Sequence, residues 1–167
     1  HVNVTMARAK LSSTYANSIL ANAEAVEAGY DEALLLDTNG FVAEGAGENL
    51  FLYKKGRLLT PPTSAGILAG ITRDSVIALA GDLGIAVEER DLPREALYSA
   101  DEVFMTGTAA EITPVRSVDR KPVADGRPGP ITRALQDAFF GLFDGRTPDR
   151  RGWLTPVHDE ALARAAA

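Results

Sequence analysis

The sequence has 167 residues, 46% of them hydrophobic and 24% charged, which is the composition of one ordinary globular domain with a sizeable core. Its net charge of -6 and its scattered arginines argue against nucleic acid as a partner, and its longest apolar runs are far shorter than the roughly 20 residues of a membrane span. The absence of cysteine and the separation of the two histidines, His1 and His158, exclude thiolate catalysis and zinc–thiolate sites.

The first half of the chain predicts one helix followed by two strand pairs. The helix runs from residue 12 or 13 to residue 28, because apolar side chains recur there at helical spacing and Gly29 follows as a stop. Short apolar runs at residues 33–36 and 41–43 are joined through an Asn-Gly pair, which is a strong hairpin signal. Runs at residues 50–53 and 58–59 repeat this pattern. The expected buried stripe of the helix consists of Tyr15, Ile19, Ala23 and Val26.

The middle of the chain predicts a second helix after a loop rich in Pro, Ser and Gly. This loop covers residues 61–70, and Thr72-Arg73-Asp74 then has the pattern of an N-cap and an acidic first turn. The helix is expected to continue to Gly84. A strand at residues 85–89 should follow it, and then a short helix opened by Pro93.

The last part predicts strands at residues 102–105 and 112–115 and a final helix from Pro130 to Gly145. Residues 146–167 form a polar tail. Strands dominate early and mix with helices later, which favours one α/β or α+β domain with an at least partly antiparallel sheet.

Two side chains could carry chemistry, which must here use Lys, Glu, Tyr, Thr or a bound cofactor. Lys10 lies at the mouth of the first helix beside Met6, Ala7 and Ala9, whereas the other three lysines lie in polar turns. An amine attacks a carbonyl only in its neutral form, which desolvation or a nearby cation favours. Glu44 lies in a glycine-rich run after a strand, where a carboxylate could hold a pyridine nitrogen protonated. Alternatively, each is an ordinary solvated side chain.

Two small-residue turns could bind anions. Gly70-Ile71-Thr72 opens a helix, so backbone amides, a hydroxyl and the positive end of the helix dipole converge there. Thr106-Gly107-Thr108-Ala109-Ala110 ends a strand and offers amides and hydroxyls to a phosphate or carboxylate. A plain helix cap and a plain strand-ending turn are the alternatives.

Taken together, these four signals occur in the order of the class IV pyridoxal-phosphate (PLP) aminotransferases, which the chain resembles from about residue 1 to Trp153. The motifs are Arg8-Ala9-Lys10 with Tyr15 and Asn17-Ser18, EGAGENLF around Glu44, LAGITR from Leu68, and MTGTAAEITPV from Met105. The runs GRPGPIT and FFGLFDG are similar to the branched-chain branch of the family. D-amino acid aminotransferases and aminodeoxychorismate lyases share the Lys and Glu but differ around GTAAEITP.

The resemblance implies a role for each motif residue. Lys10 would form the Schiff base, Glu44 would pair with the pyridine nitrogen, and Tyr15 would hydrogen-bond the phenolic oxygen of the cofactor. The phosphate would be held by the second helix start and the strand-ending turn, and the substrate carboxylate by that same turn. The implied cofactor-binding residues are Lys10, Tyr15, Glu44, Leu68, Gly70, Ile71, Thr72 and Thr108, and the substrate-binding residues are Gly107, Thr108 and Ala109. One departure from the family is Ser12-Ser13-Thr14, where relatives usually have Gly-Asn before the Tyr.

For the whole protein, the resemblance implies transamination between leucine, isoleucine or valine and 2-oxoglutarate with pyridoxal 5'-phosphate. Residues 1–167 would be the large C-terminal domain, a mixed sheet or pseudo-barrel with flanking helices as in D-amino acid aminotransferases. A small N-terminal domain, absent here, would complete the site, and at least a homodimer would form. The start at His1, without a targeting pattern, suggests an internal cut in a cytoplasmic protein. Another class IV activity, or an inactive structural or partner-binding domain, is the alternative.

Overall fold

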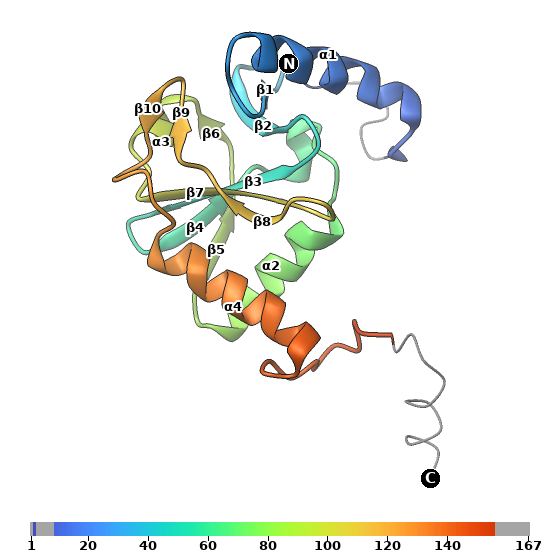
Figure 1. The fold of residues 1–167 in the computed structure, drawn as a ribbon, viewed down its shortest axis with the longest axis vertical. Coiled ribbons are helices and arrows are strands. Elements are labelled where there is room, and N and C mark those ends of the chain that lie inside the picture. The colour runs from blue at the N-terminus through green and yellow to red at the C-terminus, as the bar shows by residue number, and fades with distance from the viewer. Residues whose placement is uncertain (1, 3–8, 156–167) are drawn as a thin grey trace.

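The main sheet of the molecule has five strands in the order β5-β4-β3-β7-β8. The computed structural model describes residue 2 and residues 9–155 (Figure 1). Strands β4 and β5 pair in parallel, and the other pairs are antiparallel, so the predicted mixed sheet is confirmed. The strands are β3 (Asn49–Lys54), β4 (Arg57–Thr60), β5 (Ala86–Glu89), β7 (Glu102–Gly107) and β8 (Glu111–Pro114).

Two smaller sheets accompany it. One has the order β1-β2-β6 and the other is a two-stranded ribbon, so the strands of the described residues form open sheets and no closed barrel. The sequence did not predict β6, β9 or β10, which are only two residues long. The strands are β1 (Leu34–Leu36), β2 (Phe41–Gly45), β6 (Leu92–Pro93), β9 (Ser117–Val118) and β10 (Lys121–Pro122).

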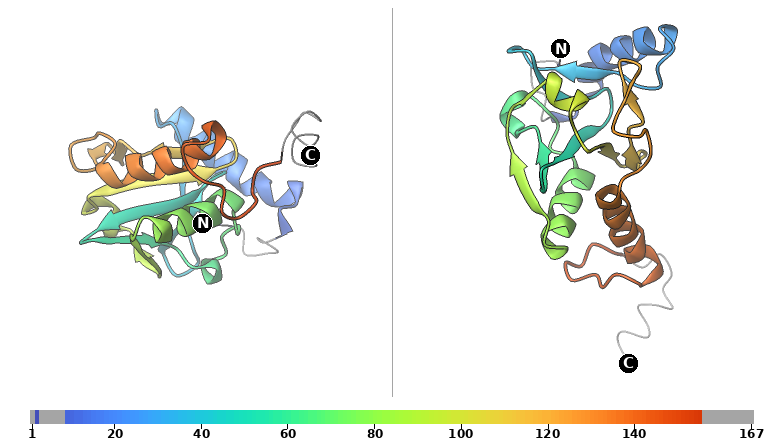
Figure 2. Two further views of the ribbon diagram at one scale, coloured as in Figure 1. Left: turned by 90° about the horizontal axis from the view of Figure 1, so that it is seen from below. Right: turned by 90° about the vertical axis from the view of Figure 1, so that its left-hand side faces the viewer.

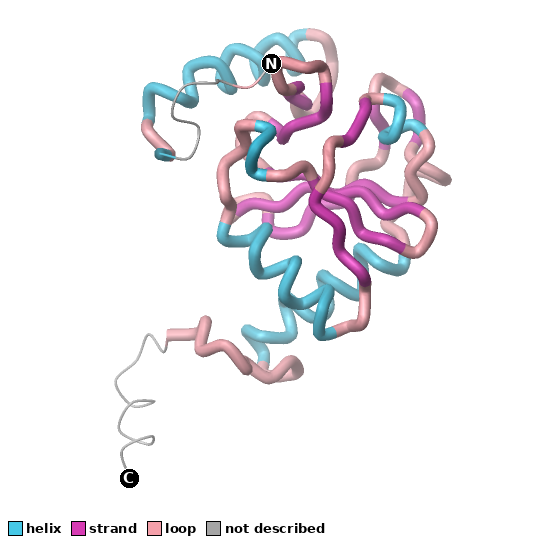
Figure 3. Tube along the Cα trace, turned by 180° about the vertical axis from the view of Figure 1, so that it is seen from behind, coloured by secondary structure: helices cyan, strands magenta, loops and turns pink. Residues whose placement is uncertain are grey.

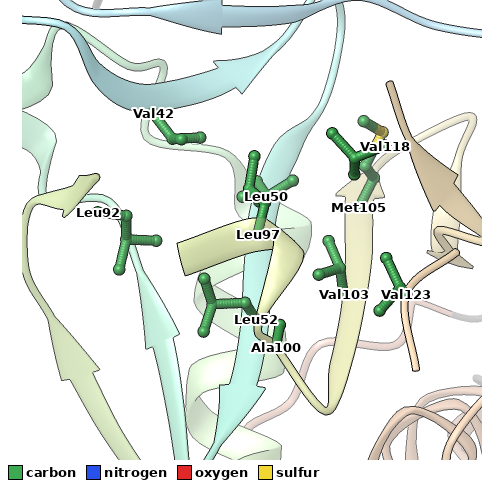
Figure 4. Close-up of a cluster of buried hydrophobic side chains, with 10 residues drawn as sticks. All are labelled: Val42, Leu50, Leu52, Leu92, Leu97, Ala100, Val103, Met105, Val118 and Val123. Carbon is green, nitrogen blue, oxygen red and sulfur yellow. The ribbon is translucent and has the colours of Figure 1, made fainter. Parts of the chain in front are cut away.

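The main sheet is buried on both faces. Along β3, Phe51 packs against the helices α2 (Ile71–Asp82) and α4 (Pro130–Asp144), and stacks on Phe104 with ring centroids 5.1 Å apart. Leu50 and Leu52 belong to a second cluster on the other face (Figure 4). Because strand side chains alternate between faces, β3 reads as a continuous apolar run and joins both halves of the core. Figure 2 shows α2 and α4 side by side against one face.

Helix α1 (Tyr15–Glu27) follows a 3-10 turn at Ser12–Thr14 and agrees with the predicted range. Its predicted apolar stripe is not buried, however. Ile19 is 64% exposed and Val26 is 56% exposed, and no residue of the helix is fully buried. The helix lies by β1 and β2 at the end of the molecule away from α2 and α4 (Figures 1 and 3). Helical periodicity identified the apolar face but not what would cover it.

The sequence predicted that Pro93 opens a short helix, and this was wrong. Pro93 lies in strand β6, where it pairs opposite Phe41. The short helix α3 (Glu95–Tyr98) begins two residues later. Proline is tolerated at a strand edge because its missing N–H need not be paired there, so the local signal was ambiguous.

An arginine of the tail contacts helix α2. Arg151 donates hydrogen bonds of 2.6 and 2.9 Å to the two carboxylate oxygens of Asp82 on α2. Residues 146–155 contain no helix or strand, and the remainder of the predicted tail, with His158, lies outside the described residues. Within the described part of the chain, no helix is long and apolar enough to cross a bilayer.

The start of α4 is held by a buried carboxylate from β7. Glu102 is 5% exposed and accepts hydrogen bonds from the amides of Ile131 (2.9 Å) and Thr132 (2.7 Å) and from the Thr132 hydroxyl (2.6 Å). A Cβ on Gly129 would lie 2.1 Å from Cδ of Glu102, which explains the glycine before Pro130. The carboxylate therefore caps the helix in place of a side chain at the N-cap itself.

Replacing Glu102 by Gln should lower the free energy of unfolding by about 2–3 kcal/mol, because the charge-assisted hydrogen bonds to α4 are weakened. Chemical denaturation measures this loss. Glu27→Gln on the exposed end of α1 is the control and should change the stability by less than about 0.5 kcal/mol. Equal stability of the two variants would contradict the capping role.

Candidate active site

A cavity of about 290 Å³ lies where the start of α1, the β2–β3 turn, the start of α2 and the end of β7 meet. It brings together nine of the ten residues that the sequence predicted for the site. The exception is Ala109, which does not line the cavity and is exposed in the β7–β8 turn. The nine residues are Lys10, Tyr15, Glu44, Leu68, Gly70, Ile71, Thr72, Gly107 and Thr108.

Glu44, on β2, is the most perturbed carboxylate of the cavity. Its Oε2 accepts hydrogen bonds from the Leu68 amide (3.0 Å) and from Nδ2 of Asn49 (3.2 Å). Burial raises the pKa of Glu44 from 4.5 to about 7, the Leu68 amide opposes this rise, and the charge of Glu48 adds to it. A carboxyl with this pKa ionises near neutral pH and has a strong affinity for a positively charged partner.

This raised pKa predicts a pH dependence of stability without any ligand. Below pH 4.5 the Glu44 carboxyl is protonated in both the folded and the unfolded chain, and between pH 4.5 and about 7 only the folded chain keeps its proton. The stability that Glu44 contributes should therefore fall as the pH rises through this window, by at most about 3 kcal/mol, and then level off. Denaturation of the wild type and Glu44→Gln across this range measures the difference. A difference that stays constant with pH would contradict the buried carboxyl.

The start of α2 presents backbone amides that precede the first hydrogen bond of the helix. Gly70, not Thr72 as predicted, is the N-cap, and no side chain caps the helix. The first hydrogen bond of the helix runs from Asp74 N to Gly70 O, so the amides of Ile71 and Thr72 precede it. These amides and the positive end of the helix dipole favour a negative group. The prediction failed because the chain enters the helix two residues earlier than the Thr suggested.

The end of β7 supplies another part of the cavity wall. Gly107 and Thr108 line it, and the hydroxyl of Thr113 fixes the turn by donating to the carbonyl of Ala110 at 2.6 Å. Thr106 also lines it, is 1% exposed, and has a buried hydroxyl without a hydrogen-bond partner. Such a group costs free energy unless a ligand or water satisfies it.

Lys10 and Tyr15 reach the cavity from the start of α1. Lys10 has a left-handed backbone (φ 46°) and precedes the 3-10 turn, which Thr14 stabilises by donating from both N and Oγ1 to the carbonyl of Leu11 (3.0 and 2.7 Å). Ser12-Ser13-Thr14 therefore forms a compact turn that leaves Lys10 and Tyr15 at the cavity. Met6, Ala7 and Arg8, which belong to the predicted lysine segment, lie outside the described residues.

The sequence analysis gave no individual role to three polar residues of the cavity wall: Glu48, Asn49 and Thr106. Burial raises the pKa of Glu48, and the nearby Glu32 adds to this effect. Glu48 and Asn49 stand inside the EGAGENLF run, so the motif contained a signal for both. Thr106 was named only as the first residue of the second turn predicted to bind an anion. Their exposure and partners depend on strand pairing, which the sequence alone does not give.

Comparison with known proteins identifies the family. Residues 1–118 match the family model described as amino-transferase class IV. The chain belongs to this family. It is 56% identical over 156 residues to the branched-chain-amino-acid aminotransferase of Salmonella typhimurium, and 48% identical over 157 residues to that of Pseudomonas aeruginosa. The matches cover 93% and 94% of this chain but 50% and 51% of those relatives, so the chain spans about half the length of the curated relatives it matches.

Solved structures give the same result for the fold. The branched-chain amino acid aminotransferase of Escherichia coli superposes with a TM-score of 0.92 at 56% identity, covering 93% of this chain and 52% of that one. The enzyme of Thermobaculum terrenum in its PLP form superposes with a TM-score of 0.86 at 51% identity, covering 90% of this chain and 50% of that one. The predicted fold class, that of class IV aminotransferases, is thereby confirmed.

Proposed function

We propose that this chain is the cofactor-carrying part of an aminotransferase that uses pyridoxal 5'-phosphate to exchange amino groups between branched-chain L-amino acids and 2-oxoglutarate. The observation that carries the proposal is one cavity, where an amine, a carboxylate of raised pKa and two turns with backbone amides and hydroxyls come together. Relatives at 48–56% identity bear the name of this activity.

The residues present fit this cofactor. The carboxylate of Glu44 suits a pyridinium nitrogen, and the start of α2 suits a phosphate, as does the partnerless hydroxyl of Thr106. We assign Thr108 and the amides of Ile71 and Thr72 to the phosphate. We assign the amides of the β7–β8 turn to the substrate carboxylate, although Ala109 lies outside the cavity wall in this chain.

In the proposed reaction, the residues of the chain bind and orient the cofactor and the substrate, and they move a proton between them. The bound cofactor supplies an electron sink for the pair left when the Cα–H bond of the substrate breaks. Lys10, which lines the cavity, would take the proton that leaves Cα and return it on the other side of the transferred nitrogen. Glu44 would hold a proton on the ring nitrogen, and Tyr15 would donate to the phenolic oxygen.

Two further features of the whole protein are proposals from the resemblance. A small N-terminal domain of the same protein would complete the substrate pocket, which agrees with the half-length match to the relatives. The protein would act in the cytoplasm as a homodimer or larger homo-oligomer.

A substrate panel tests this function. The full-length protein with added PLP and 2-oxoglutarate should form glutamate from leucine, isoleucine and valine at rates well above those from D-alanine or a simple amine. A preference for a D-amino acid or an amine would favour another class IV activity. Absence of bound cofactor under all conditions would favour a structural or partner-binding domain.

A further inference from the structure

Asn49 lines the cavity between Glu44 and the segment that leads into α2. It is the first residue of β3, its side chain is buried, and its backbone is fixed in register opposite Thr106 on β7. Its Nδ2 donates to the carbonyl of Leu68 at 2.8 Å and to Oε2 of Glu44 at 3.2 Å. One amide group thus contacts both the β2 carboxylate and the segment that leads into α2.

The hydrogen bonds around Asn49 form a closed ring. The amide of Leu68 donates at 3.0 Å to the same Oε2 of Glu44, while the carbonyl of Leu68 accepts from Asn49. Glu44, Leu68 and Asn49 therefore hold one another through three hydrogen bonds. Because the two that reach Glu44 end on Oε2, they set the rotation of the carboxylate and leave Oε1 for a ligand in the cavity.

The oxygen of the same amide lies against the N-cap of α2. A Cβ added to Gly70 would lie 2.1 Å from Oδ1 of Asn49, and the next side-chain atom beyond Asn49 would be Cβ of Arg73, at 3.7 Å. Gly70 has φ -73° and ψ 135°, a backbone that any residue can adopt. The glycine is therefore required by the close approach of Asn49 and not by its own conformation.

We infer that Asn49 is a positioning residue that fixes the carboxylate of Glu44 relative to the anion-binding start of α2. This inference rests on the proposed function, in which Glu44 and α2 hold opposite ends of one ligand. A rigid link between them presets the spacing that the ligand needs, so that less ordering is required on binding. Asn49 does not itself touch the reacting atoms.

A double-mutant cycle between Asn49 and Gly70 tests the link, with the dissociation constant of PLP in the full-length protein as the readout. Gly70→Ala alone should displace the Asn49 side chain and weaken PLP binding by about tenfold, and Asn49→Ala alone should have a similar effect. In the Asn49→Ala background, Gly70→Ala should add less than about twofold, because the atom that it meets is gone. Equal and independent effects of the two changes would overturn the inference.

A second readout needs no cofactor. In Asn49→Leu, a side chain of similar size keeps the site dry but gives no hydrogen bond, so the pKa of Glu44 should rise above its value of about 7. NMR of labelled glutamate in the cofactor-free protein follows this titration, and the neighbouring Glu48 is the same in both proteins. A purely structural role of Asn49 would leave the pKa of Glu44 unchanged, and this result would also overturn the inference.

Thr60→Val is the matched control for lost stability. It removes the buried hydrogen bond of 2.8 Å from the Thr60 hydroxyl to the carbonyl of Leu50, beside Asn49 on β3, without touching Glu44 or Gly70. It should lower stability but leave both the PLP affinity and the Glu44 titration unchanged. If the wild type binds no PLP but Asn49→Leu still shifts the titration, the proposed function fails and the positioning role stands. If PLP binds and the double-mutant cycle shows no coupling, the positioning role of Asn49 fails and the proposed function stands.

Discussion

Replacing Lys10 by Ala should lower the rate of transamination by about a thousandfold or more, because no other described side chain places an amine in the cavity. The same change should remove the visible absorbance band of covalently attached cofactor. Borohydride reduction of the wild type, followed by peptide mass spectrometry, should find the cofactor mass on the peptide that contains Lys10.

Lys55→Ala is the matched control for this prediction. Lys55 is also exposed and has a similar left-handed backbone (φ 50° against 46° for Lys10), so both changes keep a Cβ at a left-handed position and remove one positive charge. Lys55 lies in the β3–β4 turn, away from the cavity. Activity and absorbance should therefore stay near those of the wild type in Lys55→Ala. A full absorbance band in Lys10→Ala would transfer the covalent role to another lysine.

The elements that sequence reasoning predicted well are those with local causes. The ranges of α1, α2 and α4 follow from helical spacing and glycine stops, and the β1–β2 connection follows from its Asn-Gly pair. What covers an element is not local. The apolar stripe of α1 was expected to be buried, yet Ile19 and Val26 are mostly exposed, because periodicity describes only one of the two surfaces that must meet.

The candidate site shows the same division. The motif residues that were predicted from the resemblance gather at one cavity, although 98 positions separate Lys10 from Thr108 in the sequence. The supporting residues were missed because their partners are set by tertiary structure. Asn49 reaches Leu68, 19 positions away, and only the pairing of β3 with β7 makes Asn49 and Thr106 neighbours. The glycine at the N-cap of α2 also has a tertiary cause, since a Cβ on Gly70 would lie 2.1 Å from Oδ1 of Asn49.

Replacing Glu44 by Gln should slow removal of the Cα proton by about a hundredfold or more while leaving the cofactor attached to Lys10. The amide has nearly the same shape as the carboxylate, and its oxygen can still accept from Leu68 and Asn49, which both donate to Oε2 in the wild type. The geometry of the cavity is therefore preserved, and only the negative charge is lost. In the proposed role of Glu44, loss of this charge would leave the ring nitrogen unprotonated, and the electron pair left at Cα would be less well stabilised.

Exchange of the α-deuterium of leucine into water during a single turnover measures this step directly. Glu44→Asp is the informative companion, because it keeps the charge but shortens the side chain by one methylene group. If charge dominates, Glu44→Asp should retain more activity than Glu44→Gln. If the hydrogen bonds to Leu68 and Asn49 dominate, Gln should be the better substitute, since it reaches both donors and Asp does not. Near-normal exchange in Glu44→Gln would leave Glu44 as a structural carboxyl whose pKa is raised by burial and by the charge of Glu48.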